Sequence, residues 1–265
     1  MKRLACLFVF LVVVGMPQGA WAGATTPCTT ETLQGQYGFS FNGVNHPSPA
    51  GTIPGPAAEV GVFTLDREGN FSGTVTVSFN GLIFSGVAFT GTATVNPDCT
   101  GTSTVVSTLG LIEHFSTVVD DKSGEIRLLH LAPGSVIPGS ALKHDAGAAP
   151  CALASLAGTW GISITGDLVV VPPPLTGPGA VVGVFTVDRD GNFSGHDIVS
   201  LNGVFFPDTI AGTASVNPDC TGSATLSSPV VGRQHYGFVL VHSGNEMRLL
   251  QTDPGTVVFG TARRQ

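Results

Sequence analysis

The chain has 265 residues and a formal net charge of −7, because 18 Asp and Glu outnumber 11 Lys and Arg. This balance excludes nucleic acid and anionic membrane surfaces as partners, since both are bound through a basic patch. The 36 Gly and 18 Pro, with abundant Val and Thr, suit strands and turns better than helices. We therefore expect an all-β fold.

The first 22 residues have the three parts of an export signal. Met1–Arg3 is basic, Leu4–Val14 is apolar, and Ala20–Ala22 matches an A-x-A cleavage site. We expect cleavage after Ala22 and a periplasmic or extracellular location. The apolar run is shorter than the roughly 20 residues of a membrane span. No later segment resembles such a span, so the sequence predicts no membrane insertion.

One stretch occurs twice. Gly61–Gly73 reads GVFTLDREGNFSG and Gly183–Gly195 reads GVFTVDRDGNFSG. Each copy is an alternating strand, a tight turn with a glycine that can adopt positive φ, and the start of a second strand, which together indicate a β-hairpin. The similarity extends over nearly the whole mature chain. We therefore expect two tandem domains, 23–145 and 146–265.

In chain order, the first repeat predicts a short helical turn at 28–33 and then about eight strands. The strands are expected at 35–41, 61–65, 71–79, 87–95, 102–107, 114–119, 125–131 and 136–143. The second repeat follows the same order. Eight consecutive strands with short connections close an antiparallel up-and-down barrel, so we predict two such barrels in tandem. A two-sheet sandwich in each repeat stays open as the alternative.

Four cysteines remain after Cys6 leaves with the signal peptide, an even number that indicates disulfides in an exported chain. Each repeat has one cysteine near its start and one in an Asn-Pro-Asp-Cys turn. This arrangement favours Cys28–Cys99 and Cys151–Cys220, with each bridge closing its own domain. Zinc would require a CxxC pair or spaced histidine ligands. Neither is present, and we predict no metal and no cofactor.

The start of the second repeat, Gly158-Thr159-Trp160 after a short helical turn, resembles the G-x-W motif of the calycins, the lipocalin-type barrels. In that family an Arg or Lys late in the last strand packs over the Trp, which is a favourable cation–π contact. The resemblance implies this role for Arg263 or Arg264, and for Lys143 over Tyr37 in the first repeat. The layout also resembles allene-oxide-cyclase-like and dirigent barrels, without a motif that transfers catalytic residues.

His114 and His235 occupy matching positions, in Glu113-His114-Phe115 and Gln234-His235-Tyr236. A histidine beside a glutamate can act as a general base or bind the polar head group of a ligand. The open alternative is a solvated or hydrogen-bonded histidine at the end of a strand.

Arg127 and Arg248 also match, and each follows a glutamate two residues earlier, Glu125 and Glu246. Residues two apart in a strand share a face. Inside a barrel such a pair would orient a ligand, and outside it would be a surface ion pair of small energetic value. The apolar residues that alternate with the pair prefer the opposite face, which favours the outside.

Three functions remain open from sequence. The favoured one is binding of a small apolar ligand in a barrel lumen beneath the Pro-rich loops 44–56 and 167–178. The second is a cyclase or isomerase, which the sequence favours less, and the third is a structural barrel filled by side chains. The oligomeric state is not predicted. The candidate ligand contacts are His114, His235, Arg127, Arg248, Trp160 and Tyr37.

Overall fold

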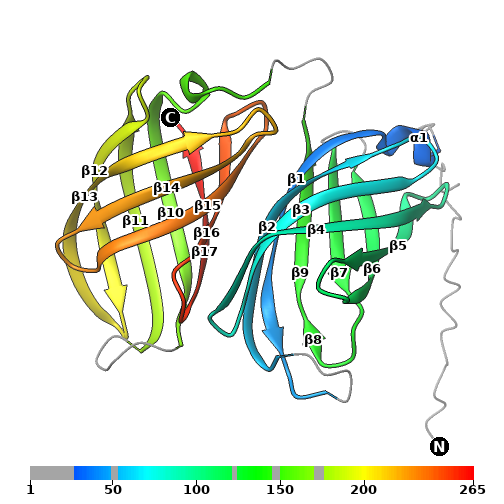
Figure 1. The fold of residues 1–265 in the computed structure, drawn as a ribbon, viewed down its shortest axis with the longest axis horizontal. Coiled ribbons are helices and arrows are strands. Elements are labelled where there is room, and N and C mark those ends of the chain that lie inside the picture. Colours follow the sequence, from blue (N-terminus) through cyan, green and yellow to red (C-terminus); the bar gives the residue numbers. More distant parts are fainter. Residues whose placement is uncertain (1–26, 49–52, 121–123, 145–149, 170–175) are drawn as a thin grey trace, which may run out of the picture.

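The computed structural model describes residues 27–48, 53–120, 124–144, 150–169 and 176–265. These residues form two β-barrels that lie side by side, one from each repeat (Figure 1). We call them barrel 1 and barrel 2 in chain order. The predicted signal peptide and its cleavage site lie outside the described residues, as do 49–52 and 170–175 of the two Pro-rich loops.

Barrel 1 follows the short helix α1, which begins after the N-cap Thr29. Strand β9 pairs with both β7 and β1, and β1 pairs with β2, so the sheet closes. The two-residue strand β8 pairs with the end of β1. The elements are α1 Thr30–Leu33, β1 Gly35–Asn45, β2 Gly55–Leu65, β3 Asn70–Phe79, β4 Leu82–Val95, β5 Thr100–Ser107, β6 Ile112–Asp120, β7 Glu125–His130, β8 Ser135–Val136 and β9 Pro138–Lys143.

Barrel 2 follows a short 3-10 helix, η1, and closes through pairing of its last strand, β17, with its first strand, β10. Two antiparallel up-and-down barrels are therefore confirmed, and the sandwich alternative is excluded because first and last strands pair. The elements are η1 Leu153–Ser155, β10 Gly158–Leu168, β11 Gly177–Val187, β12 Asn192–Leu201, β13 Val204–Val216, β14 Thr221–Ser228, β15 Gly232–Val241, β16 Glu246–Gln251 and β17 Thr256–Arg264.

The duplicated hairpin forms as its sequence predicts. Gly69 and Gly191 close the turns with φ of 90° and 83°, values that a side chain would disfavour. In the first copy the Asp66 carboxylate accepts the Asn70 amide N–H at 2.7 Å. Strand β1 is longer than expected and reaches Asn45, because it stays paired with β2 along its whole length.

Both predicted disulfides, Cys28–Cys99 and Cys151–Cys220, are present. Each joins the segment before the first strand of a barrel to the Asn-Pro-Asp-Cys turn of the same barrel. The two bridges therefore fasten the entry of each barrel within its own repeat. In the unfolded chain they also restrict loops that span 71 and 69 residues.

The end of each barrel next to its short helix is closed by an aromatic side chain that a cationic side chain covers. In barrel 2, Trp160 is fully buried, donates its indole N–H to the Leu156 carbonyl at 2.8 Å, and lies 4.6 Å from the Arg264 guanidinium. In barrel 1, Tyr37 takes the place of the Trp, and the Lys143 ammonium lies 6.0 Å from its ring centroid. The cation over the ring, which the calycin resemblance implied, is thus present in both barrels.

Replacing Arg264 with Lys is expected to lower the free energy of unfolding by about 1–2 kcal/mol. The guanidinium donates to the carbonyls of Ala157, Ser155 and Gly244, and the single ammonium of lysine cannot reach all three. Urea unfolding measures the difference. Lys143→Arg is the matched control, since Lys143 donates to one carbonyl and that bond survives the change. Equal stability of both variants would contradict the expectation.

The outer faces of the two barrels pack against each other through an apolar cluster that is distinct from the two lumens. At one edge of this interface, the Ser78 hydroxyl donates to the Thr256 carbonyl at 2.6 Å. Close by, the Gly255 amide donates to the Gly81 carbonyl at 2.9 Å. The cluster consists of Ala58, Val60, Val62 and Leu142 of barrel 1 with Val239, Val241, Leu250 and Val257 of barrel 2.

Candidate functional site

The two histidines predicted from sequence lie on the outside of their barrels. His114 is exposed, and its Nδ1 lies 3.1 Å from the Thr104 hydroxyl. His235 is exposed and contacts the Asp253 carboxylate at 2.7 Å. Consecutive residues of a strand point to opposite faces, so Glu113, and not His114, enters the lumen.

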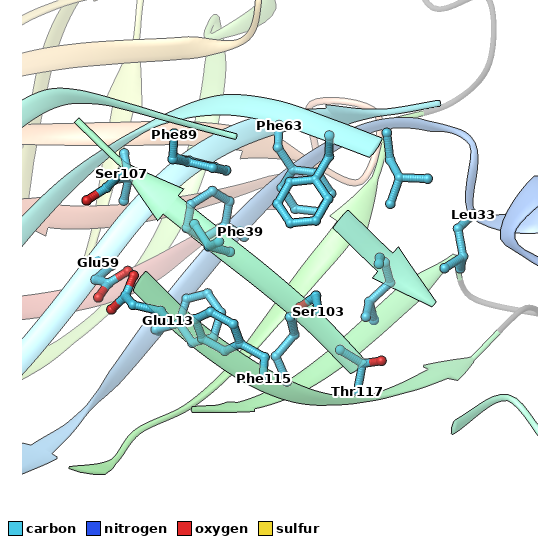
Figure 2. A pocket seen from close by; sticks show the side chains of 18 residues that line it. Leu33, Phe39, Glu59, Phe63, Phe89, Ser103, Ser107, Glu113, Phe115 and Thr117 are labelled. Atoms are coloured by element: carbon cyan, nitrogen blue, oxygen red, sulfur yellow. The ribbon is translucent and has the colours of Figure 1, made fainter. Parts of the chain in front are cut away.

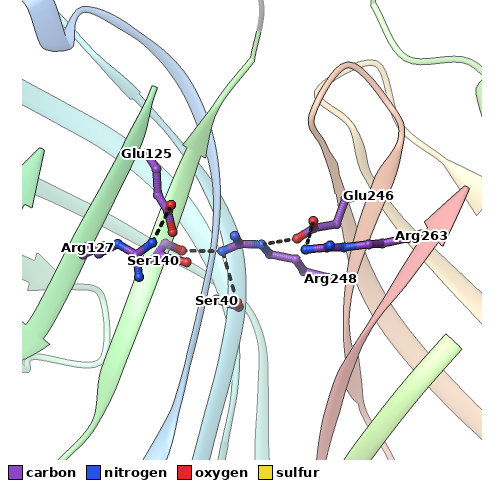
Figure 3. A network of polar contacts seen from close by, with 7 residues as sticks. All are labelled: Ser40, Glu125, Arg127, Ser140, Glu246, Arg248 and Arg263. Carbon is purple, nitrogen blue, oxygen red and sulfur yellow. Dashed lines mark hydrogen bonds and ion pairs between the residues drawn. The ribbon is translucent and has the colours of Figure 1, made fainter. Parts of the chain in front are cut away.

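The two arginines also lie outside the lumens, but in different surroundings. Arg127 is exposed and pairs with Glu125 at 3.1 Å. Arg248 is buried between the barrels, where it pairs with Glu246 and donates to the Ser140 carbonyl of barrel 1 at 2.6 Å (Figure 3). Tyr37 and Trp160 occupy the closed ends. Among the described residues, the two histidines and two arginines do not line the cavities of either lumen, which are lined by other side chains.

A cavity of about 370 Å³ opens at the end of barrel 1 opposite α1. Its walls are mostly aliphatic and aromatic side chains from the ends of the strands and from the turns between them. Three ionisable residues, Glu59, Glu113 and His130, lie among them. The lining residues are Asn45, Ile53, Glu59, Phe79, Phe84, Leu109, Leu111, Ile112, Glu113, His130, Ala132 and Ile137.

Glu59 of β2 and Glu113 of β6 form the inner boundary of this cavity. Figure 2 shows their carboxyl groups side by side, and both also line a smaller space of about 80 Å³ deeper in the lumen. That deeper space is walled by phenylalanines, including Phe39, Phe63 and Phe115. The side chains of the lumen thus change from apolar near α1 to acidic at the base of the open end.

His130 of β7 completes the cluster. Its Nε2 lies 3.6 Å from the Glu113 carboxylate, and its side chain is 8% exposed. Among the described residues this nitrogen has no hydrogen-bond partner. The ring packs at 5.1 Å from the ring of Phe115, which holds it beside the cavity.

Burial governs the charges of this cluster. Burial, and secondly the charge of Glu113, raise the pKa of Glu59 to about 8. Burial also raises the pKa of Glu113, and it lowers the pKa of His130, with a further contribution from His114. Near neutral pH the cluster therefore holds a proton on a carboxyl group while the imidazole is neutral.

The alternation of side chains along the strands is the feature of the sequence that indicates an inward orientation of Glu59 and His130. Glu59 has the same parity as Phe63 and Leu65 on β2, and His130 has the same parity as Ile126 on β7. Each therefore belongs to the inward set. Nothing in the individual strands, however, indicates that Glu59, Glu113 and His130 meet across the lumen.

Barrel 2 does not repeat the cluster. The positions that correspond to Glu59, Glu113 and His130 hold Val181, Gln234 and Gln251. Its own inward carboxyl groups are Asp197 and Asp208, which face each other on β12 and β13. Burial and the charge of Asp208 raise the pKa of Asp197 to about 6. Two spaces inside barrel 2 measure about 50 and 60 Å³.

No family model matches the chain, and no curated protein is matched. Among solved structures, a de novo designed fluorescence-activating β-barrel has a TM-score of 0.31 and 16% identity, covering 43% of this chain and 99% of its own. Isotype 1 transferrin binding protein B of serogroup B Neisseria meningitidis has a TM-score of 0.32 and 9% identity, and the match covers 91% of this chain and 78% of that protein. Aeromonas veronii immune modulator A has a TM-score of 0.24 and 8% identity, and the match covers 87% of this chain and 94% of that protein. At such low similarity, nothing about the function of this chain follows.

Within the described ranges, no helix is both long and apolar enough to cross a membrane. The same residues contain no group of three or more His, Cys, Asp or Glu that is arranged to hold a metal ion.

Proposed function

We propose that barrel 1 binds a small, largely apolar molecule in the cavity opposite α1. The observation that carries this proposal is the cavity itself, about 370 Å³ in volume with apolar walls and a few polar groups at its base. Small-molecule sites typically combine these features, with volumes of about 300–1,000 Å³. The ligand contacts are then Glu59, Glu113 and His130 with the surrounding apolar residues.

The exposed apolar side chains at the rim support the same proposal. Leu82, Ile112 and Val136 are 55%, 65% and 59% exposed and lie at the ends of strands on the open side of barrel 1. An apolar ligand that enters the cavity would cover part of this surface. Removing the surface from water would contribute to affinity at about 25 cal/mol per Å².

We also propose that each barrel is of the calycin type and folds as its own domain, within 23–145 and 146–265. The short helix, the buried ring at the start of the first strand and the cation from the last strand support this type over the dirigent type. The two disulfides support export to an oxidising compartment, as the predicted signal peptide requires.

Filling the cavity is expected to weaken binding. Ala132→Trp places an indole in the cavity and should weaken binding of a neutral lipophilic fluorescent probe, such as N-phenyl-1-naphthylamine, by at least about tenfold, or about 1.4 kcal/mol. Phe84→Trp in the otherwise unchanged chain adds a second readout, because its indole would line the cavity and transfer energy to the bound probe.

Ala88→Trp is the matched control, because Ala88 is exposed on the outside of β4. This variant should bind the probe as the unchanged chain does. Trp160 is not a suitable reporter, since it is buried in barrel 2. Absence of probe binding to the unchanged chain, or equal binding by Ala132→Trp and Ala88→Trp, would contradict the proposed function.

A further inference from the structure

We infer that the ligand of the barrel 1 cavity is a primary amine, whose ammonium group sits among Glu59, Glu113 and His130 while its apolar body fills the cavity. This inference rests on the proposed function and specifies the class of ligand. It follows from the charge, the hydrogen-bonding state and the shape of the site.

The charges around the cavity favour a cationic ligand. Two carboxyl groups line the cavity, and no Lys or Arg is among the described lining residues. The glutamates outside the lumens contrast with them, since Glu125 pairs with Arg127, and Glu246 with Arg248. Two ionised carboxylates in an apolar site without a cation are unfavourable, so the free site keeps a proton, and a cationic ligand could take the place of that proton.

One buried nitrogen of the site has no hydrogen-bond partner among the described residues. It is the Nε2 of His130, which lies at the edge of the cavity. A buried polar atom in this state favours any group that completes its hydrogen bonding. A neutral imidazole has one acceptor nitrogen, and in the Nδ1–H tautomer this nitrogen is Nε2, through which His130 accepts one N–H from a ligand.

The number of acceptors and the shape of the cavity suit an ammonium group with an apolar body. A primary ammonium has three N–H donors and no acceptor, like the head of a lysine side chain. Glu59, Glu113 and His130 offer three acceptors at the base of one cavity. The arrangement does not suit a metal ion, because the described residues hold no group of three such ligands in metal-binding geometry. The aromatic walls, including Phe79 and Phe84, suit an apolar body and the adjoining positive charge.

Binding of an ammonium must be accompanied by loss of a proton from the site. Below about pH 8 the carboxyl cluster holds a proton, and a cation beside it favours the ionised form. Binding of the ammonium therefore releases up to one proton from the carboxyl cluster to solvent. Its affinity should rise by up to about tenfold per pH unit between pH 6 and 8, whereas that of an alcohol of equal chain length should stay constant.

The test compares octylamine, octanol and octanoate with the full mature chain by isothermal titration calorimetry at pH 7, in two buffers of different ionisation enthalpy. Octylamine should bind at least about tenfold more tightly than octanol and release protons, and octanoate should bind most weakly. Glu59→Gln and Glu113→Gln should each weaken octylamine binding by about tenfold and leave octanol unchanged. Glu125→Gln, outside the lumen, is the matched control and should change neither.

The outcomes separate the two proposals. Equal affinities for octylamine and octanol, or an octylamine affinity that survives Glu59→Gln and Glu113→Gln, would overturn the amine inference while the proposed function stands. Binding of none of the three probes would overturn both. Octylamine binding that Glu125→Gln weakens as strongly as Glu59→Gln would place the amine on the outer surface and would also overturn the inference.

Discussion

Glu59→Gln is expected to stabilise the protein at pH 8 by roughly 3–5 kcal/mol. The pKa of this carboxyl is about 8 in the folded chain, against an ordinary value of 4.5. Between these values the folded state keeps a proton that the unfolded chain releases. The contribution of Glu59 to the free energy of unfolding is therefore most favourable below about pH 4.5. It decreases as the pH rises to about 8 and stays constant above that.

Urea unfolding at pH 4, 6 and 8 measures this effect. Glutamine cannot ionise, so the stability of Glu59→Gln should fall less between pH 4 and 8 than that of the unchanged chain. Glu31→Gln is the control, because Glu31 lies on α1 with its side chain 69% exposed. Identical pH profiles for Glu59→Gln and the unchanged chain would contradict the raised pKa of Glu59. With the expected profile, Glu59→Gln would be more stable than the unchanged chain at pH 8 but would bind the amine more weakly. The same carboxyl group would thus lower stability and contribute to binding.

Arg248→Met is expected to lower the free energy of unfolding by about 3–5 kcal/mol, whereas Arg127→Met should lower it by less than about 1 kcal/mol. Both arginines follow a glutamate in the same local sequence, Glu-x-Arg-Leu-Leu. Arg248 is buried, and its loss removes a partner of buried Glu246 as well as the donor to the Ser140 carbonyl across the interface (Figure 3). Arg127 has its side chain 69% exposed, so water replaces its contacts.

Thermal unfolding of the two variants gives the comparison directly. Arg263 still contacts Glu246 at 3.2 Å in Arg248→Met, but its own side chain is 76% exposed and compensates only in part. Arg248→Lys keeps the charge and should lie between the two variants, because an ammonium cannot reproduce the guanidinium contacts to Glu246 and Ser140 together. A melting temperature for Arg248→Met equal to that of Arg127→Met would contradict the buried interface.

Local patterns in the sequence were sufficient for much of the fold. Period-2 alternation, the Asp-x-x-Gly turns and the Asn-Gly turn at Asn80 and Gly81 specify strands and hairpins through nearest neighbours along the chain. One cysteine pair per repeat was enough to predict the disulfides. The open-end site could not be predicted in this way. Glu59, Glu113 and His130 are far apart in sequence, and they meet only because eight strands close and bring β2, β6 and β7 around one lumen.

The sequence by itself determined that this chain folds as two separate barrels, because each repeat alternates apolar and polar side chains over enough strands to enclose its own core. Only the tertiary structure decided which outward-facing side chains are buried. Val60 of β2 is buried against barrel 2, whereas its counterpart Val182 on β11 is 62% exposed, and Arg248 is buried where Arg127 is exposed. The local sequences at these pairs are alike. The physical reason is that burial depends on what packs against a strand, and one barrel can cover only the face of the other that it contacts.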